Sequence, residues 1–316
     1  MTVIAVTGAS GFVGQRVVED LARRGHVAVG VVRGPSAPST PQARVVGDIG
    51  AQTDWARALE GVEVVVHCAA RAHVMHERAT DPLPLYRAVN VEGTRRLAEQ
   101  AARHGVRRIV YLSSVKAAGE RSAPGRPLAA SDASVPEDAY GVSKREAELA
   151  LLDVGAATGL ETVIVRPPLV YGPGVKGNFL RLMAAIARGW PLPLGALDNR
   201  RSMVSLANLT DFISLCVESP IAVGRIFFVS DGDDLSAASL ARRMGAAFGR
   251  PARMLPVPGA VLSILGRVTG KSAEIERLVG TLQVDLTDAR GLLAWSPPQT
   301  VDQGLRETAD WFRSLR

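Results

Sequence analysis

The sequence has few cysteines, few aromatic residues and no long apolar run, and each shortage excludes a class of protein. Its 316 residues include only Cys68 and Cys216, both in apolar segments, so we expect buried free thiols in a reducing compartment. No Cys/His cluster has metal-ligand spacing, so no metal is expected. No apolar run of about 18 residues occurs, so no membrane span is predicted. Met1 leads directly into a strand pattern, so we expect no signal peptide and a cytoplasmic protein.

Charge and aromatic content give no support to a nucleic-acid partner. The net charge is +6 and the pI is about 9.8, but basic residues are mixed with acidic ones and form no long run. Aromatic residues make up 5% of the chain and show no stacking pattern. We therefore expect no nucleic-acid binding. The positive balance suits a small anionic ligand, such as a nucleotide sugar, equally well.

The first fourteen residues have the pattern of a dinucleotide-binding turn. The apolar run 3–6 predicts a buried parallel strand, and a helical pattern of apolar residues covers 13–21. Between them, Gly8 allows a sharp turn, Gly11 lets a pyrophosphate approach the backbone, and Gly14 lets the helix pack on the strand. The helix N-terminus attracts phosphates through its free N–H groups and its dipole. We predict a nucleotide site here.

The remaining pattern alternates strands and helices as far as residue 170. This alternation predicts an α/β fold with a doubly wound parallel sheet, a Rossmann fold. Beyond Tyr171, Pro and Gly punctuate shorter elements, so we predict an NAD(P)-binding domain over 1–170, with a returning strand near 203–229, and a mainly substrate-binding α/β region over 171–316. The predicted strands are 27–32, 45–49, 62–67, 106–112, 162–166 and 226–229, and the predicted helices are 51–59, 82–104, 139–154, 179–188, 237–248 and 302–316.

The end of the second strand bears on the choice of cofactor. A site for NAD usually has an acid here to bind the ribose 2′-hydroxyl, but the strand ends in Val32-Arg33. Arg33 could instead pair with a 2′-phosphate, which favours NADP(H), with NAD(H) still possible. Asp48 and Ile49 follow the third strand, where such a pair often lies beside the adenine; Asp48 could alternatively cap a helix.

Four polar or small residues belong to the segments around the predicted cofactor cleft. His67, on an apolar strand, fits a hydrogen-bonded core histidine better than a catalyst. Ala69 and Ala70 follow it and would allow a cofactor to approach closely. Asn90 is a polar residue on the inward stripe of the helix over 82–104.

A serine, a tyrosine and a lysine carry the predicted chemistry. Tyr140 and Lys144 stand four residues apart at a helix start and therefore share one face. We expect the lysine ammonium to lower the phenol pKa from about 10, making Tyr140 a general acid or base near neutral pH. Ser114 follows a parallel strand at its carboxyl end, where ligands bind in such sheets, and its hydroxyl could bond the reacting oxygen.

These motifs together resemble the extended short-chain dehydrogenase/reductases of the nucleotide-sugar epimerase, dehydratase and 4-reductase family. The resemblance covers essentially the whole chain. It implies a Rossmann domain and a smaller C-terminal region that closes over a nucleoside-diphosphate sugar. The matching segments are TGASGFVG at 7–14, YLSSV at 111–115, YGVSK at 140–144, RPPLVYGPG at 166–174 and LLAWSP at 292–297.

The resemblance also implies a role for individual residues. Ser114, Tyr140 and Lys144 would be catalytic, and Arg201 would clamp the diphosphate, with its neighbour Arg200 as the competing candidate. Lys144 would also bond the nicotinamide ribose. The implied cofactor-binding residues are Gly8, Gly11, Phe12, Val13, Gly14, Arg33, Asp48, Ile49, Ala69, Ala70, Asn90, Tyr140, Lys144, Pro167 and Val170, and the implied substrate-binding residues are Ser114, Asn178 and Arg201.

Departures from the family pattern narrow the choice among the family's reactions. Family dehydratases carry an Asp-Glu pair after the catalytic Ser/Thr, where this chain has Val115 and Lys116, which argues against a dehydratase. Family 4-epimerases usually hold NAD tightly and place an acid where this chain has Arg33. We therefore favour an NADP(H)-dependent reductase of a UDP-linked 4-keto-6-deoxy (N-acetyl)hexose, from the branch that serves bacterial surface polysaccharide.

Other interpretations stay open at this point. A UDP-glucose or UDP-N-acetylglucosamine 4-epimerase with retained NAD is nearly as well supported. A redox-sensing binding module without turnover is disfavoured by the Tyr140/Lys144 pair. The resemblance implies a homodimer through a four-helix bundle built from 82–104 and 139–154. The apolar stretch 257–268 could lie on a membrane surface, although core packing explains it better.

Overall fold

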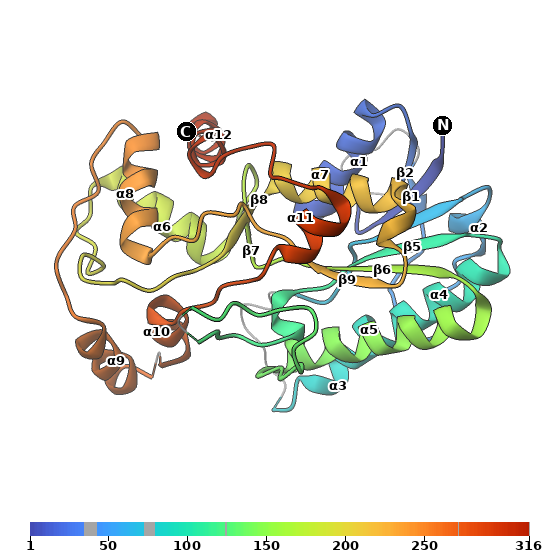
Figure 1. The fold of residues 1–316 in the computed structure, drawn as a ribbon, viewed down its shortest axis with the longest axis horizontal. Helices are drawn as coiled ribbons and strands as arrows, with labels where there is room; N and C mark the ends of the chain where they lie inside the picture. Colours follow the sequence, from blue (N-terminus) through green and yellow to red (C-terminus); the bar gives the residue numbers. More distant parts are fainter. Residues whose placement is uncertain (35–42, 73–79, 124, 271, 316) are drawn as a thin grey trace.

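One parallel sheet organises the first part of the chain. The computed structural model describes residues 1–34, 43–72, 80–123, 125–270 and 272–315. Within them seven strands are ordered β3-β2-β1-β4-β5-β6-β9, all parallel, with helices on both faces (Figure 1). This confirms the predicted fold class. The strands are β1 Val3–Thr7, β2 Val27–Val32, β3 Arg44–Val45, β4 Val64–His67, β5 Arg108–Leu112, β6 Glu161–Arg166 and β9 Arg225–Phe228.

The strand order reverses at β1, which places the site. β1 lies between β2 and β4, so the chain leaves β1 toward one edge of the sheet and returns toward the other. In open α/β sheets the crevice outside the carboxyl ends of the strands at such a reversal binds ligands. Thr7, Val31 and His67 lie side by side there. The turn after β1 therefore opens at the expected ligand position.

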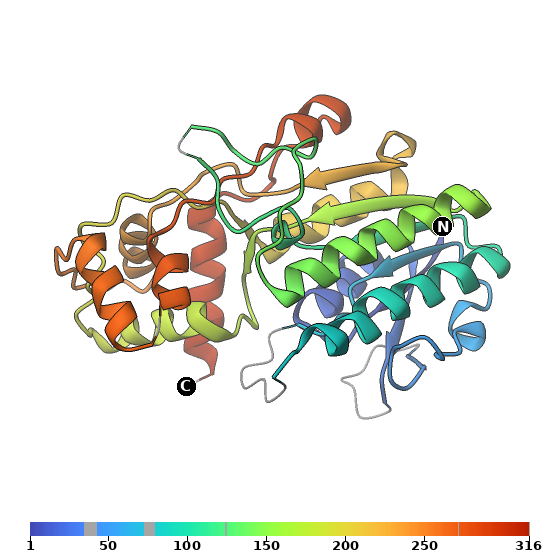
Figure 2. The same cartoon turned by 90° about the horizontal axis from the view of Figure 1, so that it is seen from below.

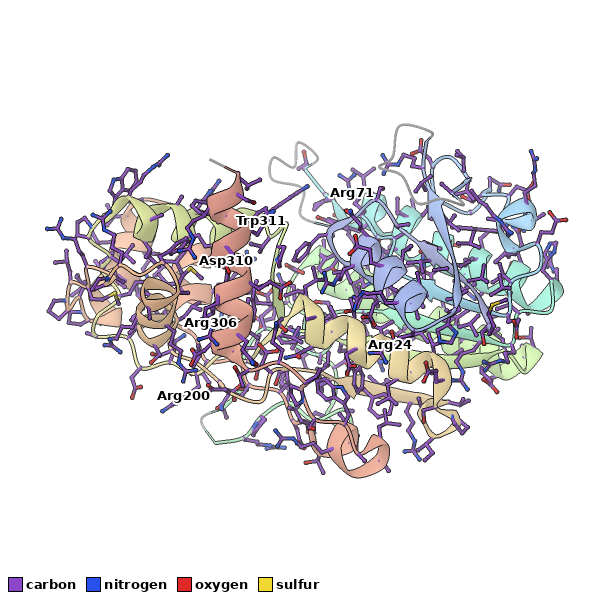
Figure 3. All side chains as sticks on the ribbon, turned by 90° about the horizontal axis from the view of Figure 1, so that it is seen from above. Arg24, Arg71, Arg200, Arg306, Asp310 and Trp311 are labelled. Atoms are coloured by element: carbon purple, nitrogen blue, oxygen red, sulfur yellow. The ribbon has the colours of Figure 1, made fainter. Side chains whose placement is uncertain are left out.

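Apolar side chains bury both faces of the sheet. Valine and isoleucine dominate the central strands, which is the composition of parallel strands covered on both sides. Helices α1 Phe12–Arg23 and α7 Leu206–Glu218 pack on one face, where the Arg24 guanidinium bonds Asp211 of α7 (Figure 3). Helices α4 Gly93–Arg103 and α5 Ala139–Thr158 cover the other face.

The long helix predicted over 82–104 contains a wider turn. It begins as α3 Leu83–Tyr86, continues as the π-helical segment η1 Arg87–Glu92 and ends as α4. π-Helical turns are rare in proteins, and those that occur often lie at functional sites. This one contains Asn90. The helix predicted at 51–59 is shorter, because only α2 Ala56–Leu59 is helical.

Most of the chain after β6 forms a second body of structure at one end of the molecule, whereas α7, β9 and the helix at 287–293 lie against the main sheet (Figures 1 and 2). Strand β7 Leu169–Tyr171 pairs with β8 Met203–Ser205 in a separate two-stranded sheet. The chain then crosses back, so α7 packs on the main sheet and β9 extends it, at the place of the predicted returning strand. The remaining helices are α6 Gly177–Arg188, α8 Ala237–Ala247, α9 Gly259–Val268, α10 Ser272–Val279, α11 Thr287–Leu293 and α12 Val301–Ser314, with short 3-10 turns η2 Val115–Ala117 and η3 Pro220–Ala222.

Helix α9 is packed on one side only. Leu262 is buried, but Ile264 and Val268 are 60% and 81% exposed, so core packing accounts for only part of this apolar stretch. In the part of the chain that the structure describes, no helix combines the length and apolarity needed to cross a membrane. Cys216 is buried, Cys68 is partly buried, and both are free thiols.

Candidate active site

The turn after β1 depends on its glycines. Gly8 has a φ of +67°, and a Cβ there would lie 2.9 Å from the Ala69 backbone. A Cβ on Gly14 would lie 2.2 Å from the Gly8 carbonyl oxygen, so only glycine lets α1 approach the turn this closely. The Gly11 N–H donates to the Gly8 carbonyl at 2.8 Å, and Gly11 caps α1 without a side-chain bond. The turn therefore has the close-approach geometry that a dinucleotide requires.

Two close contacts link predicted cofactor residues to neighbouring segments. Phe12 and Val13 form the first turn of α1, and a Cβ on Gly174 would lie 3.2 Å from the Phe12 ring, so the loop after β7 lies against the start of α1. Ile49 packs closely on Gly93 of α4, where a Cβ would lie 2.4 Å from its methyl group. Segments from both bodies of the structure thus meet beside the turn.

Arg33 has an acidic partner that the linear pattern does not reveal. Its Nε lies 3.2 Å from Asp48 Oδ1, and both side chains are more than four-fifths exposed. The turn after β3 therefore returns a carboxylate to the end of β2, although the residue that follows β2 is basic. Asp48 accordingly lies beside Arg33 rather than capping α2.

The loop after β4 is fixed by two polar groups. The Ala69 N–H donates to Thr7 Oγ1 at 3.1 Å. Asn90 accepts from the Arg71 N–H at 2.7 Å and donates to the Arg71 carbonyl at 3.1 Å, with a further bond to Ser143 Oγ at 2.9 Å. The structure thus gives Asn90 a role in holding the loop that contains Ala70, and the loop forms one wall of the predicted cofactor cleft.

His67 is a core histidine, as predicted. Its two ring nitrogens bond the Thr7 and Thr94 hydroxyls at 2.6 and 3.0 Å. Burial, reinforced by the nearby Lys144 charge, lowers the His67 pKa to about 3. A neutral ring with both nitrogens bonded links β1, β4 and α4 and has no free position for proton transfer.

Ser114 and Tyr140 come together above the end of β5. The Ser114 side chain lies near the Tyr140 phenol and acts to lower its pKa. Ser114 caps the short turn η2 by accepting from the Lys116 N–H at 3.2 Å, and Tyr140 lies in the first turn of α5 with its ring edge against Tyr86 at 6.0 Å between centroids. The Val115 N–H donates to the Pro167 carbonyl at 2.9 Å, which brings the start of β7, and hence Val170, beside the pair.

The predicted effect of Lys144 on Tyr140 is wrong for this structure. The buried Lys144 ammonium donates to the Leu112 carbonyl at 2.6 Å and lies 4.1 Å from the centre of the Tyr111 ring. Burial lowers the Lys144 pKa to about 7. The Tyr140 pKa is raised by burial and by the Asp138 charge, and only the nearby Ser114 side chain opposes that rise. The periodicity places both side chains on one face, but it does not determine where the ammonium points.

Two of the three predicted substrate residues, Asn178 and Arg201, lie in the second body of structure. Asn178 is exposed in the first turn of α6, where it accepts weakly from Arg181 at 3.4 Å. Arg201 is half-buried and donates to the Arg277 and Gly280 carbonyls at the end of α10. Its neighbour Arg200 is exposed on the outside of this region (Figure 3). The structure therefore favours Arg201 over Arg200 as an inward-facing cation.

Sequence reasoning missed the charged residues that support the Ser114/Tyr140 pair. Asp138 caps α5 by accepting from the Gly141 N–H at 2.7 Å, and its other oxygen bonds the Lys116 ammonium. An Asp directly before a helical pattern is a recognised cap signal, so Asp138 could have been found. Lys116 was considered only as a departure from the dehydratase pattern. Its partner Glu120 lies in an irregular loop that no local pattern predicts.

Fold and glycine turn together define an enzyme of the NAD-dependent epimerase and oxidoreductase class. A family model described as the NAD dependent epimerase/dehydratase family matches residues 4–229. The chain belongs to this family, within the extended short-chain dehydrogenase/reductase superfamily.

Three known proteins illustrate the similarity. The chain is 44% identical over 311 residues to a UDP-glucose 4-epimerase of Vibrio cholerae, covering 98% of this chain and 95% of the relative. The crystal structure of UDP-N-acetylglucosamine 4-epimerase from Bacillus cereus superposes with a TM-score of 0.81 at 22% identity, covering 99% of this chain and all of the other. UDP-glucuronic acid 4-epimerase from the same organism, in complex with UDP-glucuronic acid and NAD, has a TM-score of 0.80 at 21% identity over 100% of both chains.

Proposed function

We propose that this protein is an NAD-dependent C4 epimerase of a UDP-hexose or UDP-N-acetylhexosamine. The Ser114 side chain and the Tyr140 phenol, which lie near each other above the end of β5, carry the proposal, because a neighbouring serine and phenol can exchange a proton with a sugar hydroxyl. The 44% identity to a UDP-glucose 4-epimerase favours epimerisation over the reduction that the sequence pattern favours.

The residues present fit a nicotinamide dinucleotide. Gly8 and Gly14 leave the backbone of the turn uncovered at positions where a Cβ would clash, and α1 begins at this turn without a side-chain cap. In the proposal Gly8, Gly11, Phe12, Val13 and Gly14 hold the pyrophosphate, while Ala69, Ala70, Pro167 and Val170 border the nicotinamide. A bound nicotinamide supplies the hydride acceptor and donor for the redox step at C4.

The protein groups move the proton. Tyr140 removes the proton from the sugar O4–H as C4 is oxidised, while Ser114 holds that oxygen by a hydrogen bond. Tyr140 returns the proton to O4 after the opposite face of C4 has been presented. The buried Lys144 ammonium, which donates to the Leu112 carbonyl at the end of β5, bonds a ribose hydroxyl of the cofactor in this proposal. Asn178 and Arg201 hold the diphosphate in this proposal.

The position of Asp48 favours NAD over NADP. A 2′-phosphate next to Arg33 would also meet the Asp48 carboxylate, and like charges repel at that distance. Asp48 offers an acceptor for a ribose hydroxyl at the place where the sequence shows only Arg33. Arg33 remains the observation that favours the second candidate, an NADPH-dependent reductase of a UDP-linked 4-keto-6-deoxy hexose.

One experiment separates the two candidates. The protein is incubated with UDP-glucose, UDP-N-acetylglucosamine or a UDP-4-keto-6-deoxy sugar, each with and without added NADPH, and both sugars and cofactors are followed by mass spectrometry. We expect conversion of a UDP-hexose to its 4-epimer without added cofactor, together with NAD released from the denatured protein. NADPH consumption with the keto sugar alone would overturn the epimerase in favour of the reductase.

A homodimer is part of the proposal. Helices α4 and α5 lie together on one face of the sheet, and exposed leucines remain on α3 and α5, at Leu85 (43%) and Leu149 (44%). Pairing these helices with those of a second copy would bury that surface in a four-helix bundle. Light scattering after gel filtration tests this, with a dimer expected for the unmodified protein and monomer for Leu149→Glu.

A further inference from the structure

A cluster of charged side chains joins the two segments that carry Ser114 and Tyr140. Lys116 lies two residues after Ser114, and Asp138 lies two residues before Tyr140. The Lys116 ammonium bonds Asp138 Oδ2 and, at 2.8 Å, Glu120 Oε1. Lys116 and Asp138 are 26% and 33% exposed, so the pair is partly shielded from water. It thus spans the gap between the loop of one reacting hydroxyl and the helix of the other.

The backbone of the two segments is in contact at the same place. A Cβ on Gly141 would lie 2.5 Å from the Lys116 carbonyl oxygen, so the first turn of α5 lies directly against the Ser114 loop. The Gly141 N–H donates to Asp138 Oδ1, and the Lys116 N–H donates to Ser114 Oγ. Each end of the ion pair is therefore bonded to the backbone or side chain of a reacting segment.

Asp138 is held as a carboxylate by these contacts. Its burial raises its pKa, but the bonds from Lys116 and from the Gly141 N–H outweigh burial and leave the pKa below its ordinary value. An ionised Asp138 both caps α5 and binds Lys116. A small movement of either segment would stretch one of these bonds.

The cluster continues into the second body of structure. Glu120 Oε2 accepts from Arg277 Nε of α10 at 3.2 Å, while its other oxygen binds Lys116. Arg277 also lies 3.9 Å from Asp138. The carbonyl of Arg277 in turn accepts from Arg201 at 2.8 Å. A continuous series of bonds therefore connects α10 to the segments of Ser114 and Tyr140.

We propose that Lys116 and Asp138 are positioning residues that hold the Ser114 hydroxyl opposite the Tyr140 phenol, and that Glu120 and Arg277 extend this support to α10. The inference rests on the proposed function for its catalytic readout. It assigns no contact with substrate to any of the four residues. A reacting pair displaced by about 1 Å loses on the order of 100-fold in rate, which sets the size of effect that such support can have.

The variants separate the effect of the side-chain charges from the effects of the α5 cap and of fold stability. Lys116→Met removes the ammonium, and Lys116→Arg restores a cation. Asp138→Asn removes the charge but keeps the cap, because Asn caps helices as well as Asp, whereas Asp138→Ala removes both. Arg121→Gln is the matched control: it breaks the neighbouring Arg121–Glu276 bond between the same loop and α10 without touching Lys116.

With a UDP-hexose as substrate, Lys116→Met and Asp138→Asn are expected to lower kcat about 10- to 100-fold with KM changed less than about twofold. Lys116→Arg is expected to recover most of kcat, and Arg121→Gln to resemble the unmodified protein. Melting temperatures should fall clearly only for Asp138→Ala. An unchanged kcat, a rise in KM in place of the fall in kcat, or equal losses in Lys116→Met and Lys116→Arg would each overturn the proposal.

Hydrogen exchange gives a readout that does not depend on activity. Amides of 114–118 and 139–143 should exchange faster in Lys116→Met than in the unmodified protein, and at normal rates in Arg121→Gln. If the unmodified protein converts no UDP-hexose, the proposed function fails, and this exchange pattern alone decides the positioning role. Unchanged exchange in Lys116→Met would overturn that role even in an active enzyme.

Discussion

The Rossmann half and the C-terminal half of this molecule are built on different principles. In the first half, strand, glycine turn and helix follow one another within about twenty residues, and local geometry fixes the site. In the second half, distant segments complete each other: Leu192 pairs with Met254, and Arg201 pairs with both Leu235 and Leu282. We conclude that the glycine turn is encoded locally, whereas the C-terminal half depends on long-range assembly.

The largest effect should come from Tyr140. Tyr140→Phe removes the proton-exchanging hydroxyl but keeps the ring, so we expect kcat to fall about 1000-fold while NAD binding stays within about twofold. Activity is measured by epimer formation, and NAD affinity by fluorescence titration. Survival of turnover in Tyr140→Phe would show that another group handles the proton.

The second-largest effect should come from Arg201, in the second half. Arg201→Met removes an inward-facing guanidinium, and a lost charge-assisted bond to a diphosphate should raise KM about 10- to 100-fold without changing NAD affinity. Arg200→Met, at the exposed neighbour, is the control and should leave KM nearly unchanged. Equal effects from the two variants would place the diphosphate elsewhere.

The glycine turn should respond through stability and cofactor affinity together. Gly14→Ala places a methyl group 2.2 Å from the Gly8 carbonyl oxygen, so we expect a loss of about 1–3 kcal/mol in the free energy of unfolding and weaker NAD binding. Gly291→Ala is the control, because a Cβ there meets nothing within 4 Å and alanine favours a helix. Denaturant unfolding measures the free energy of unfolding of both variants. If Gly14→Ala is as stable as Gly291→Ala, the turn is not as closely packed as described.

The smallest effect is a pH dependence from Lys144, whose pKa burial lowers from 10.5 to about 7. Between these values the unfolded chain binds one more proton at this lysine than the folded chain does, so Lys144 makes the free energy of unfolding rise with pH in that window. The slope is at most about 1.4 kcal/mol per pH unit. Below pH 7 Lys144 is protonated in both the folded and the unfolded chain, so the full free-energy cost of burying its ammonium is present. Lys144→Met should remove this contribution, and identical slopes in the two proteins would contradict the shift.

The sequence predicts the sheet, and it marks Ser114, Tyr140 and Lys144 as candidate catalytic residues, because these signals are local. Apolar strand runs, the three glycines and the four-residue spacing of Tyr140 and Lys144 all lie within short segments. The direction of the Lys144 ammonium was not predictable, since it depends on the Leu112 carbonyl and the Tyr111 ring, thirty residues earlier in the chain. The Arg33–Asp48 pair was missed for the same reason: the two residues lie on neighbouring strand ends.

The second half shows the same limit more strongly. Pro and Gly marked its start near Tyr171, but the return of the chain to the main sheet through α7 and β9 leaves only a weak local signal. The ion pairs of Lys116, Glu120 and Arg277 join three separate segments, so no spacing rule could connect them. Resemblance to a family supplied the roles proposed for Asn178 and Arg201, which the local pattern could not.

The central claim is that Ser114 and Tyr140 support oxidation and reduction at C4 of one sugar that stays bound throughout. The most direct measurement uses UDP-glucose or UDP-N-acetylglucosamine carrying deuterium at C4, with no cofactor added. The account predicts a 4-epimer that retains the deuterium at C4. Failure to form the epimer, or its formation with deuterium replaced by solvent hydrogen, would contradict the account.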